Sequence, residues 1–397
     1  MLVYWVWFAQ LSGISLAQKL TLLQHFHDPE EIYHLLPDAL AQCPEQVQSA
    51  LAEKDLSQAQ EILSLCIQKG IGIITLRDDS YPTKLRNTYD PPLILYFKGK
   101  LPDWEAVPVI GVVGTRKASA YGLTTAQRFG SEIAGCGALV VSGGAGGIDT
   151  RAMEGALEGD YPVVGVLGCG VDVVYPAGNK QLFERVCRQG CLISEYPPKT
   201  TAAPWHFPHR NRIISGMSDG LLVVEAPEQS GALITARHAL EQGRDVFVVP
   251  GNIDVASCAG SNALLQERAT AALSGWNVVQ TYEDRYPGKV HKNRISPVVK
   301  VAQTLEIPSQ MTVAHSVADK KAIDKEEKST YTSLGGMDPS LSEEEQTVLD
   351  NVPAEPMFID ELIAASTLPA GKVKSILTKL ALKKKILQHP GGRVSRK

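Results

Sequence analysis

The residues best suited to chemistry in this chain lie in glycine-rich loops that follow apolar runs. The stretch "VVSGGAGGIDTRAMEGAL" (140–157) passes from an apolar strand through glycines into a helical pattern. Ser142, Gly143 and Gly144 would there place backbone N–H groups at a helix start, where amides and the helix dipole both favour an anion. The loop contains four glycines, at positions 143, 144, 146 and 147. A tight turn explains one or two of them but hardly four. The loop therefore predicts an anion site, and Asp149 is interpreted as a helix cap.

Basic residues follow several other apolar runs. Arg116 and Lys117 lie in "GTRKASAYG" (114–122), and Lys180 lies in "YPAGNKQL". A guanidinium just beyond a strand end is well placed to contact a phosphate through two hydrogen bonds, although a solvated surface charge is the simpler alternative. These positions predict a positively charged surface where the strands of the sheet end.

The segment "FPHRNRIISGMSDGLLVVEA" places Arg210, Asn211 and Arg212 directly before an apolar helix and strand. Two arginines this close to an apolar segment need anionic partners. The partners are either internal carboxylates, such as Glu195 and Glu225, or an external phosphate. The sequence leaves both alternatives open.

Catalytic and cofactor signals are weak. Gly144 does not begin a G-x-G-x-x-G fingerprint, because Asp149 stands where the last glycine is needed, and the chain contains no G-x-x-x-x-G-K-[ST] loop. No histidine lies in the glycine loops, and His206 and His209 lack a convergent third metal ligand. We therefore expect no catalytic residues, no metal and no cofactor. Basic groups after successive strands instead suit the backbone of a single-stranded nucleic acid.

Composition limits the class of protein. The chain has 397 residues, seven cysteines and a formal net charge of -4, so no global basic field indicates nucleic acid and any such binding must come from a local patch. The apolar start "MLVYWVWFAQ" is too short for a membrane span and lacks the features of a signal peptide. The expectation is a cytoplasmic protein with reduced thiols and no membrane association.

The pattern along the chain predicts several parts. Residues 1–70 read as short helices, and residues 71–106 as a connector or extension of the next domain. Residues 107–286 alternate apolar strands with glycine turns and helices, which indicates an α/β domain with a parallel sheet. In such sheets ligands bind beyond the carboxyl ends of the strands. Residues 287–339 are polar and charged, typical of a flexible linker, and residues 340–397 predict a winged helix.

The C-terminal segment "AGKVKSILTKLALKKK" predicts a helix whose buried stripe contains Val373, Ile376, Leu377 and Leu380. On its other faces or in the following wing lie four basic residues: Lys372, Lys379, Lys383 and Arg393. They could contact a duplex backbone or a protein partner, and the two alternatives stay open. Base-reading Arg or Asn residues are missing from this helix, which argues against sequence-specific binding.

Several motifs, taken in order, resemble the DNA-processing protein family DprA/Smf. They include "GVVGTRKASAYG", "VVSGGAGGIDTRAMEGAL", "VLGCGVDVVYPAGNKQL", "FPHRNRIISGMSDGLLVVEA" and "SGALITARHALEQGRDVFVVPG", and the match is strong over about 107–270. The resemblance implies an N-terminal domain similar to a sterile alpha motif and a Rossmann-like domain that binds single-stranded DNA without cutting it. It also implies a homodimer that loads a RecA-type recombinase on DNA taken up in natural transformation.

The resemblance further implies that the DNA-phosphate pocket is lined by Arg116 with Lys117, by Ser142 to Gly144, by Lys180, and by the basic segment Arg210, Asn211 and Arg212. Two positions depart from the family pattern. Met153 stands where a histidine is usual, which removes a candidate base, and Arg268 stands in "LLQERA" where a glycine is usual, which leaves the local turn and the dimer face open.

The alternative function is that of a nucleotide-hydrolysing enzyme similar to nucleoside-monophosphate phosphoribohydrolases, on the same Rossmann-like fold. Those enzymes carry a P-G-G-x-G-T loop followed by a catalytic glutamate. The corresponding region here, "SGALITARHALEQ", offers no such pair before Glu241.

Overall fold

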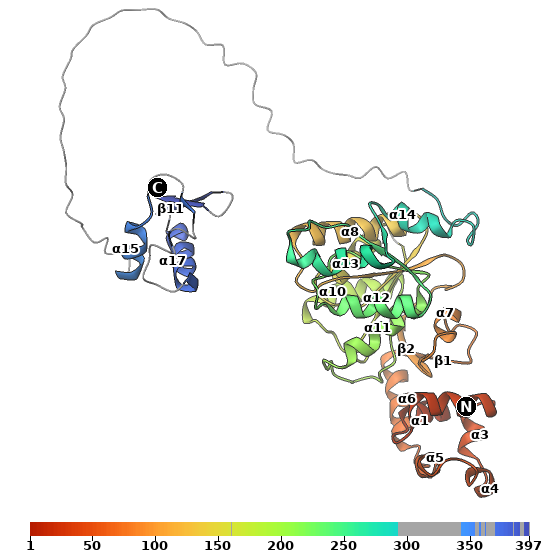
Figure 1. Cartoon of the computed structure of the whole chain (residues 1–397). Helices are drawn as coiled ribbons and strands as arrows, with labels where there is room; N and C mark the ends of the chain where they lie inside the picture. Colours follow the sequence, from red (N-terminus) through yellow and green to blue (C-terminus); the bar gives the residue numbers. More distant parts are fainter. Residues whose placement is uncertain are drawn as a thin grey trace, which may run out of the picture. The chain divides into compact units, whose positions relative to one another are not determined.

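The computed structural model describes residues 1–159 and 161–292 and, further along the chain, 343–353, 357–358, 362, 370–383, 385–389 and 393–396. The chain divides into two compact units, Met1–Thr304 and Leu305–Lys397, and each is described by itself (Figure 1).

The first unit is built around a sheet with the described strand order β1-β2-β6-β5-β4-β3-β7-β8-β9. The strands from β6 to β9 along this order pair in parallel. Their bounds are β3 (Val109–Val113), β4 (Leu139–Ser142), β5 (Val163–Val166), β6 (Cys191–Ser194), β7 (Gly220–Val223), β8 (Asp245–Val248) and β9 (Thr270–Ala271). The first six of these each coincide with an apolar run within residues 107–286, where the sequence predicts strands. The predicted parallel α/β sheet is therefore confirmed.

Helices cover both faces of this sheet (Figure 1). The connecting helices are α8 (Ala120–Gly135), α9 (Ile148–Ala156), α10 (Lys180–Gln189), α11 (His206–Met217), α12 (Gly231–Glu241), α13 (Ala259–Glu267) and α14 (Gly275–Val279). Residues of α8, α9, α10 and α14 share one apolar cluster. Residues of α11, α12 and α13 share another. The first domain is thus a sandwich of two helical layers around a sheet.

Alternation along β3 shows why the strands read as continuous apolar runs. Ile110 and Val112 belong to the cluster with α8, whereas Val109 and Val113 belong to the cluster with α11. Successive side chains of a strand point to opposite faces, so a sheet covered on both faces needs apolar residues at every position.

The strand order reverses at β3. The chain proceeds from β3 through β4, β5 and β6 in one direction and then returns to β7 on the other side of β3. In open α/β sheets, ligands bind in the crevice that such a reversal leaves at the carboxyl ends of the strands. The loops after β3 and β7 are therefore the expected place for a site.

The segment expected as a connector extends the sheet with antiparallel strands. β1 (Gly72–Thr75) pairs with β2 (Ile94–Gly99), and β2 pairs with β6; the short helix α7 (Thr83–Arg86) lies between β1 and β2 in the chain. At the other end, Val290 is buried and the N–H of His291 donates to the carbonyl of Cys136. Packing thus continues beyond residue 286, and residues 293–339 of the predicted linker lie outside the described residues.

The N-terminal residues form six helices: α1 (Leu2–Gln10), α2 (Leu16–His25), α3 (Pro29–Tyr33), α4 (Pro37–Leu40), α5 (Glu45–Leu51) and α6 (Ser57–Lys69). The apolar start of the chain is explained by α1, in which Trp5, Val6, Trp7 and Phe8 are buried. In the described part of the chain, no helix has both the length and the apolar character needed to cross a membrane. None of the seven cysteines, all of which lie in the described part of the chain, forms a disulfide.

The second unit has the arrangement of a winged helix. Its described elements are α15 (Glu343–Asp350), β10 (Met357–Phe358), α17 (Ala370–Leu382), β11 (Ile386–His389) and β12 (Arg393–Arg396), and the strands pair in the order β10-β12-β11. The predicted buried stripe of α17 is confirmed, because Val373, Ile376, Leu377 and Leu380 are all buried. Lys379 and Lys383 are exposed, and the side chains of Lys372 and Arg393 lie outside the description.

Candidate nucleic-acid interface

A cavity of about 520 Å³ lies at the strand-order reversal. The residues that follow β3 and β7 line it, together with the first turn of α11 and the start of α12. Of the residues predicted to contact phosphate, it brings together Arg116, Lys117, Arg210 and Asn211. The crevice expected from topology is therefore present, and basic residues from two separate segments meet in it.

Arg116 and Lys117 are exposed at the cavity mouth. The guanidinium carbon of Arg116 lies 4.7 Å from the centre of the Phe207 ring. Within the part of the chain that the structure describes, Arg116 forms no ion pair with a carboxylate. A guanidinium that stacks on an aromatic face keeps its N–H groups free in the plane of the stack, so Arg116 can bind an anion without giving up an internal partner.

Arg210 has a different position from Arg116, because it is almost fully buried beneath the cavity. Its Nη1 donates to the carbonyl of Gly143 at 2.5 Å and to the carbonyl of Val166, and its Nε donates to Oδ1 of Asn211. Burial lowers the pKa of Arg210 to about 10. Arg210 thus ties the glycine loop to the end of β5 and places a positive charge under the cavity.

Gly147 is a position of the glycine loop that only glycine fills easily. Gly147 has a φ of +82°, and a Cβ there would lie 2.4 Å from the carbonyl oxygen of Thr115 and 2.7 Å from that of Arg116. The close approach packs the start of α9 against the backbone that carries Arg116. The N-terminus of α9 and the "GTRK" loop are therefore one packed structure.

Asp149 does not cap α9, and the interpretation as a cap is wrong. The helix begins at Ile148 with Gly147 as its N-cap, so Asp149 lies within the first turn. Its carboxylate is buried at the cavity and accepts a hydrogen bond from the N–H of Ala145. Burial raises the pKa of Asp149 to about 6, while the charges of Arg210 and Arg116 act in the opposite direction. Above pH 6 the carboxyl group is mostly ionised and its negative charge offsets part of the positive charge of the site. Below pH 6 it is mostly protonated and offsets less of that charge.

Arg212 is paired inside the protein. Its Nη2 lies 2.6 Å from Oε2 of Glu195, and its Nε lies 3.2 Å from Oδ2 of Asp90. The side chain is buried and does not line the cavity. The sequence leaves open whether these arginines pair with internal carboxylates or with an external phosphate. Arg212 pairs with internal carboxylates. Glu225, the other internal candidate, instead accepts hydrogen bonds from the hydroxyl and N–H of Ser119.

The remaining predicted contacts lie outside the cavity lining. The hydroxyl of Ser142 is buried and donates to the carbonyl of Val112, and Gly143 and Gly144 are buried behind the loop surface. Lys180 is exposed at the first residue of α10, beyond the end of β5. The preceding Asn179 donates to the carbonyl of Gly144, which joins this loop to the glycine loop.

The aromatic residues at the cavity were not predicted from the sequence. Phe207 lies below Arg116, and Tyr175 lies 5.4 Å from the Phe207 ring, measured between ring centres. Trp205, two residues before Phe207, is 73% exposed and lies outside the cavity lining. A signal for Phe207 was present, because it precedes Arg210 by three residues and such residues share a helix face. The "YP" turn carries no comparable signal for Tyr175.

The two histidines of this segment have protein partners. His206 Nδ1 lies 3.0 Å from the carbonyl oxygen of Gly168, and His209 Nε2 lies 3.3 Å from a Glu195 oxygen. No group of three or more metal-ligating side chains occurs in the stretches that the structure covers.

Comparison with known proteins gives a consistent result. A family model described as "DNA recombination-mediator protein A" matches residues 72–283, and one described as "DprA winged helix domain" matches residues 337–392. Protein Smf from Synechocystis is 30% identical over 403 residues, covering 99% of this chain and 98% of that protein. The DNA processing protein DprA from Bacillus subtilis is 37% identical over 245 residues, covering 61% of this chain and 82% of that protein.

Solved structures agree. The X-ray structure of DNA processing protein A from Streptococcus pneumoniae superposes with a TM-score of 0.62 at 32% identity, covering 70% of this chain and 98% of that chain.

Proposed function

The chain belongs to the DNA processing protein A (DprA/Smf) family, and on that premise we propose that it binds single-stranded DNA, without cutting it, at the cavity beyond the carboxyl ends of β3 and β7. The observation that carries the proposal is the position of Arg116, exposed at the cavity, stacked on Phe207 and free of a carboxylate partner among the described residues. A basic group beside an aromatic face suits a polymer that offers both phosphates and bases.

The phosphates would lie along the carboxyl edge of the sheet. Arg116 and Lys117 are the direct contacts at the cavity, and Lys180 continues the basic edge on the neighbouring loop. Arg210 is buried beneath the cavity, where its positive charge attracts phosphate and its hydrogen bond to the carbonyl of Gly143 fixes the glycine loop. Arg212 is excluded from this role, because a phosphate would have to displace Glu195 and Asp90.

The bases would lie against the aromatic residues at the same edge. Phe207 in the first turn of α11 and Tyr175 in the loop after β5 present ring surface next to the basic groups, and the exposed Trp205 directly precedes α11. Ring surfaces accept any base, so this arrangement favours binding that tolerates sequence. In duplex DNA the base faces are already stacked, which favours the single strand at this site.

Delivery of the bound strand to a RecA-type recombinase in natural transformation, as a homodimer, is the further part of the proposal. It is supported by membership of the family and by the match of a recombination-mediator model. A homodimer would place two copies of the basic edge on one strand and so lengthen the contact.

The proposal is tested by fluorescence anisotropy of a labelled oligonucleotide, single-stranded and duplex, across a salt series. Binding dominated by phosphate contacts weakens as salt increases, with a slope of about 0.7 per neutralised phosphate for a single strand. The proposal expects tighter binding of the single strand with such a slope. Equal or tighter binding of the duplex would contradict it.

The alternative, a nucleotide-hydrolysing enzyme, now has one candidate acid in Asp149, whose pKa near 6 suits proton transfer. Against it, the Asp149 carboxylate is buried and is already held by the N–H of Ala145. Incubation of the pure protein with AMP, followed by chromatography for free adenine, separates the two functions. Turnover that is lost in Asp149→Asn would favour the enzyme.

A further inference from the structure

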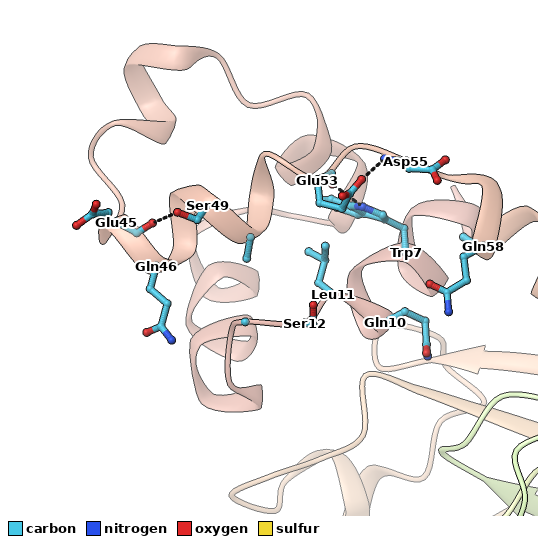
Figure 2. Close-up of a pocket in the computed structure, with 13 residues that line it drawn as sticks. Trp7, Gln10, Leu11, Ser12, Glu45, Gln46, Ser49, Glu53, Asp55 and Gln58 are labelled. Carbon is cyan, nitrogen blue, oxygen red and sulfur yellow. Dashed lines mark hydrogen bonds between the residues drawn. The ribbon is translucent and has the colours of Figure 1, made fainter.

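The helical N-terminal residues contain a second groove, larger than the cavity at the sheet. Its volume is about 730 Å³, within the range of sites that hold a small ligand or a few side chains. Figure 2 shows Leu11 and Ser12 between two groups of lining residues, with Glu45, Gln46 and Ser49 in one and Trp7, Glu53, Asp55 and Gln58 in the other.

The floor of the groove is apolar and the rim is polar. Trp7, Leu11 and Ala59 are buried at the floor. The rim residues Gln46, Ser49 and Gln58 are exposed, as are the three acidic residues Glu45, Glu53 and Asp55. An apolar floor inside a polar, hydrogen-bonding rim is the usual composition of a site for a peptide segment.

Two of the three acidic rim residues have hydrogen-bond partners in their own segment. Glu53 accepts from the N–H of Asp55, and Asp55 accepts from the N–H and hydroxyl of Ser57. Among the residues that the structure describes, none of the three rim carboxylates forms an ion pair, and the lining contains no lysine or arginine. The groove therefore has carboxylates at both of its ends that form no ion pair within the described part of the chain.

The nearest basic residue in the sequence points elsewhere. Lys54 lies between Glu53 and Asp55 in the chain, but its ammonium donates to the carbonyl of Tyr33 and lies over the rings of Trp7 and Tyr33. Burial lowers the pKa of Lys54, in keeping with this enclosed position. Lys54 thus packs on Trp7 at the floor of the groove and does not pair with the carboxylates of the rim.

We propose that this groove binds a short basic segment of a partner protein, one that carries lysine or arginine on both sides of an apolar residue. The apolar side chain would lie on Leu11 and Trp7, and the flanking cations would face Glu45 at one end and Glu53 with Asp55 at the other. Charge complementarity selects this occupant, because the same carboxylates repel a phosphate backbone. The groove is therefore a protein-docking surface distinct from the proposed DNA site.

The test uses the full chain and an array of six-residue peptides, each with an apolar residue flanked by lysine or arginine. Matched arrays carry glutamate or glutamine in place of the cations. The critical variant is Glu45→Gln/Glu53→Gln; the glutamine at 53 keeps an oxygen for the N–H of Asp55. The matched control is Asp38→Asn/Glu61→Gln, which changes the net charge equally at exposed helical positions outside the groove.

Basic peptides should bind the parent and the control equally and bind the groove variant about five- to tenfold more weakly, as expected for the loss of two exposed ion pairs. Gln46→Lys, which adds a cation to the rim, should weaken the same peptides. Binding of single-stranded DNA should be unchanged in every variant, so failure here is distinct from failure of the proposed DNA site.

Three results would overturn the proposal. The first is no binding of basic peptides to the parent protein, and the second is equal binding by the parent and the groove variant. The third is a change of oligomeric state in the groove variant without peptide binding, measured by light scattering, which would assign the groove to a second copy of the chain.

Discussion

The guanidinium carbon of Arg116 lies 4.7 Å from the centre of the Phe207 ring, although 91 positions separate the two residues in the sequence. The contact joins the loop after β3 to the first turn of α11. It places a free positive charge and an aromatic face side by side, at the point where the strand order reverses.

Replacement of Phe207 by alanine should weaken single-stranded DNA binding about tenfold and leave the salt dependence nearly unchanged. The reason is that the ring contributes base contact and support for Arg116 but carries no charge; loss of one base–aromatic stack costs about 1–3 kcal/mol. Anisotropy across a salt series measures both quantities. Tyr89→Ala removes a 90% exposed ring away from the cavity and is the matched control. Equal affinities of the two variants would show that Phe207 does not contact the bases.

Replacement of Arg212 by glutamine should lower stability by about 3 kcal/mol, because it leaves Glu195 half-enclosed without its partner. Thermal unfolding measures the loss. The double variant Arg212→Gln/Glu195→Gln should recover part of it, since the more buried of the two carboxylates that Arg212 pairs with is then neutral and only the more exposed Asp90 is left unpaired. The salt slope of DNA binding should stay at the parent value in the folded variants. A lower slope would instead place Arg212 among the phosphate contacts.

Replacement of Gly147 by alanine should lower both stability and DNA affinity. A left-handed backbone and a Cβ within 2.4 Å of the Thr115 carbonyl oxygen force the start of α9 away from the loop that carries Arg116. The expected loss of stability is about 1–3 kcal/mol, measured by urea unfolding. Gly146→Ala is the control, because a Cβ at Gly146 meets no atom within 4 Å. Similar behaviour of the two variants would contradict the close packing of these loops.

The titration of Asp149 should make stability depend on pH. Burial raises its pKa from 3.8 to about 6, so between these values the folded protein binds a proton that the unfolded chain does not. The contribution of this carboxyl to the free energy of unfolding therefore increases as pH falls through 6 towards 4, and above pH 6 the buried charge is destabilising. Asp149→Asn should be more stable than the parent at about pH 7.5, and the difference should shrink by about pH 4.5.

Urea unfolding of the two proteins at matched pH values gives this difference, and a difference that does not change with pH would contradict the assignment. DNA binding offers a second readout. Protonation of Asp149 removes a negative charge beside Arg210 and Arg116, so the parent should bind single-stranded DNA a few times more tightly on acidification. His206 and His209 remain in both proteins, so the part of the change that Asp149→Asn abolishes belongs to Asp149.

The sequence predicted the scaffold of the site well. Six apolar runs gave the parallel strands from β3 to β8, because a strand covered on both faces needs apolar residues throughout. From that sheet it follows that the loops after the strands meet at one edge. Arg116 and Arg210 were therefore expected near each other, and both line the cavity.

The partners of individual side chains were not predictable in the same way. Whether Arg212 faces a phosphate or a carboxylate depends on Asp90 and Glu195, which reach it only through the placement of β2 beside β6. Asp149 was interpreted as a helix cap, because aspartate is a preferred residue type at that position. Its burial depends on how the loops fold over it, which the sequence does not show. Antiparallel pairing of the short strand β2 leaves no comparable long-range pattern in the sequence.

The central claim is that the cavity beyond the carboxyl ends of β3 and β7 binds DNA phosphate. It is tested most directly by anisotropy of a labelled single-stranded oligonucleotide with Arg116→Ala. Arg188→Ala is the control, because it removes the same charge from an exposed position in the last turn of α10. Loss of one phosphate contact should reduce the salt slope by about 0.7 and lower the affinity about tenfold in Arg116→Ala, with Arg188→Ala like the parent. Affinities and slopes that are equal in the two variants would contradict the claim.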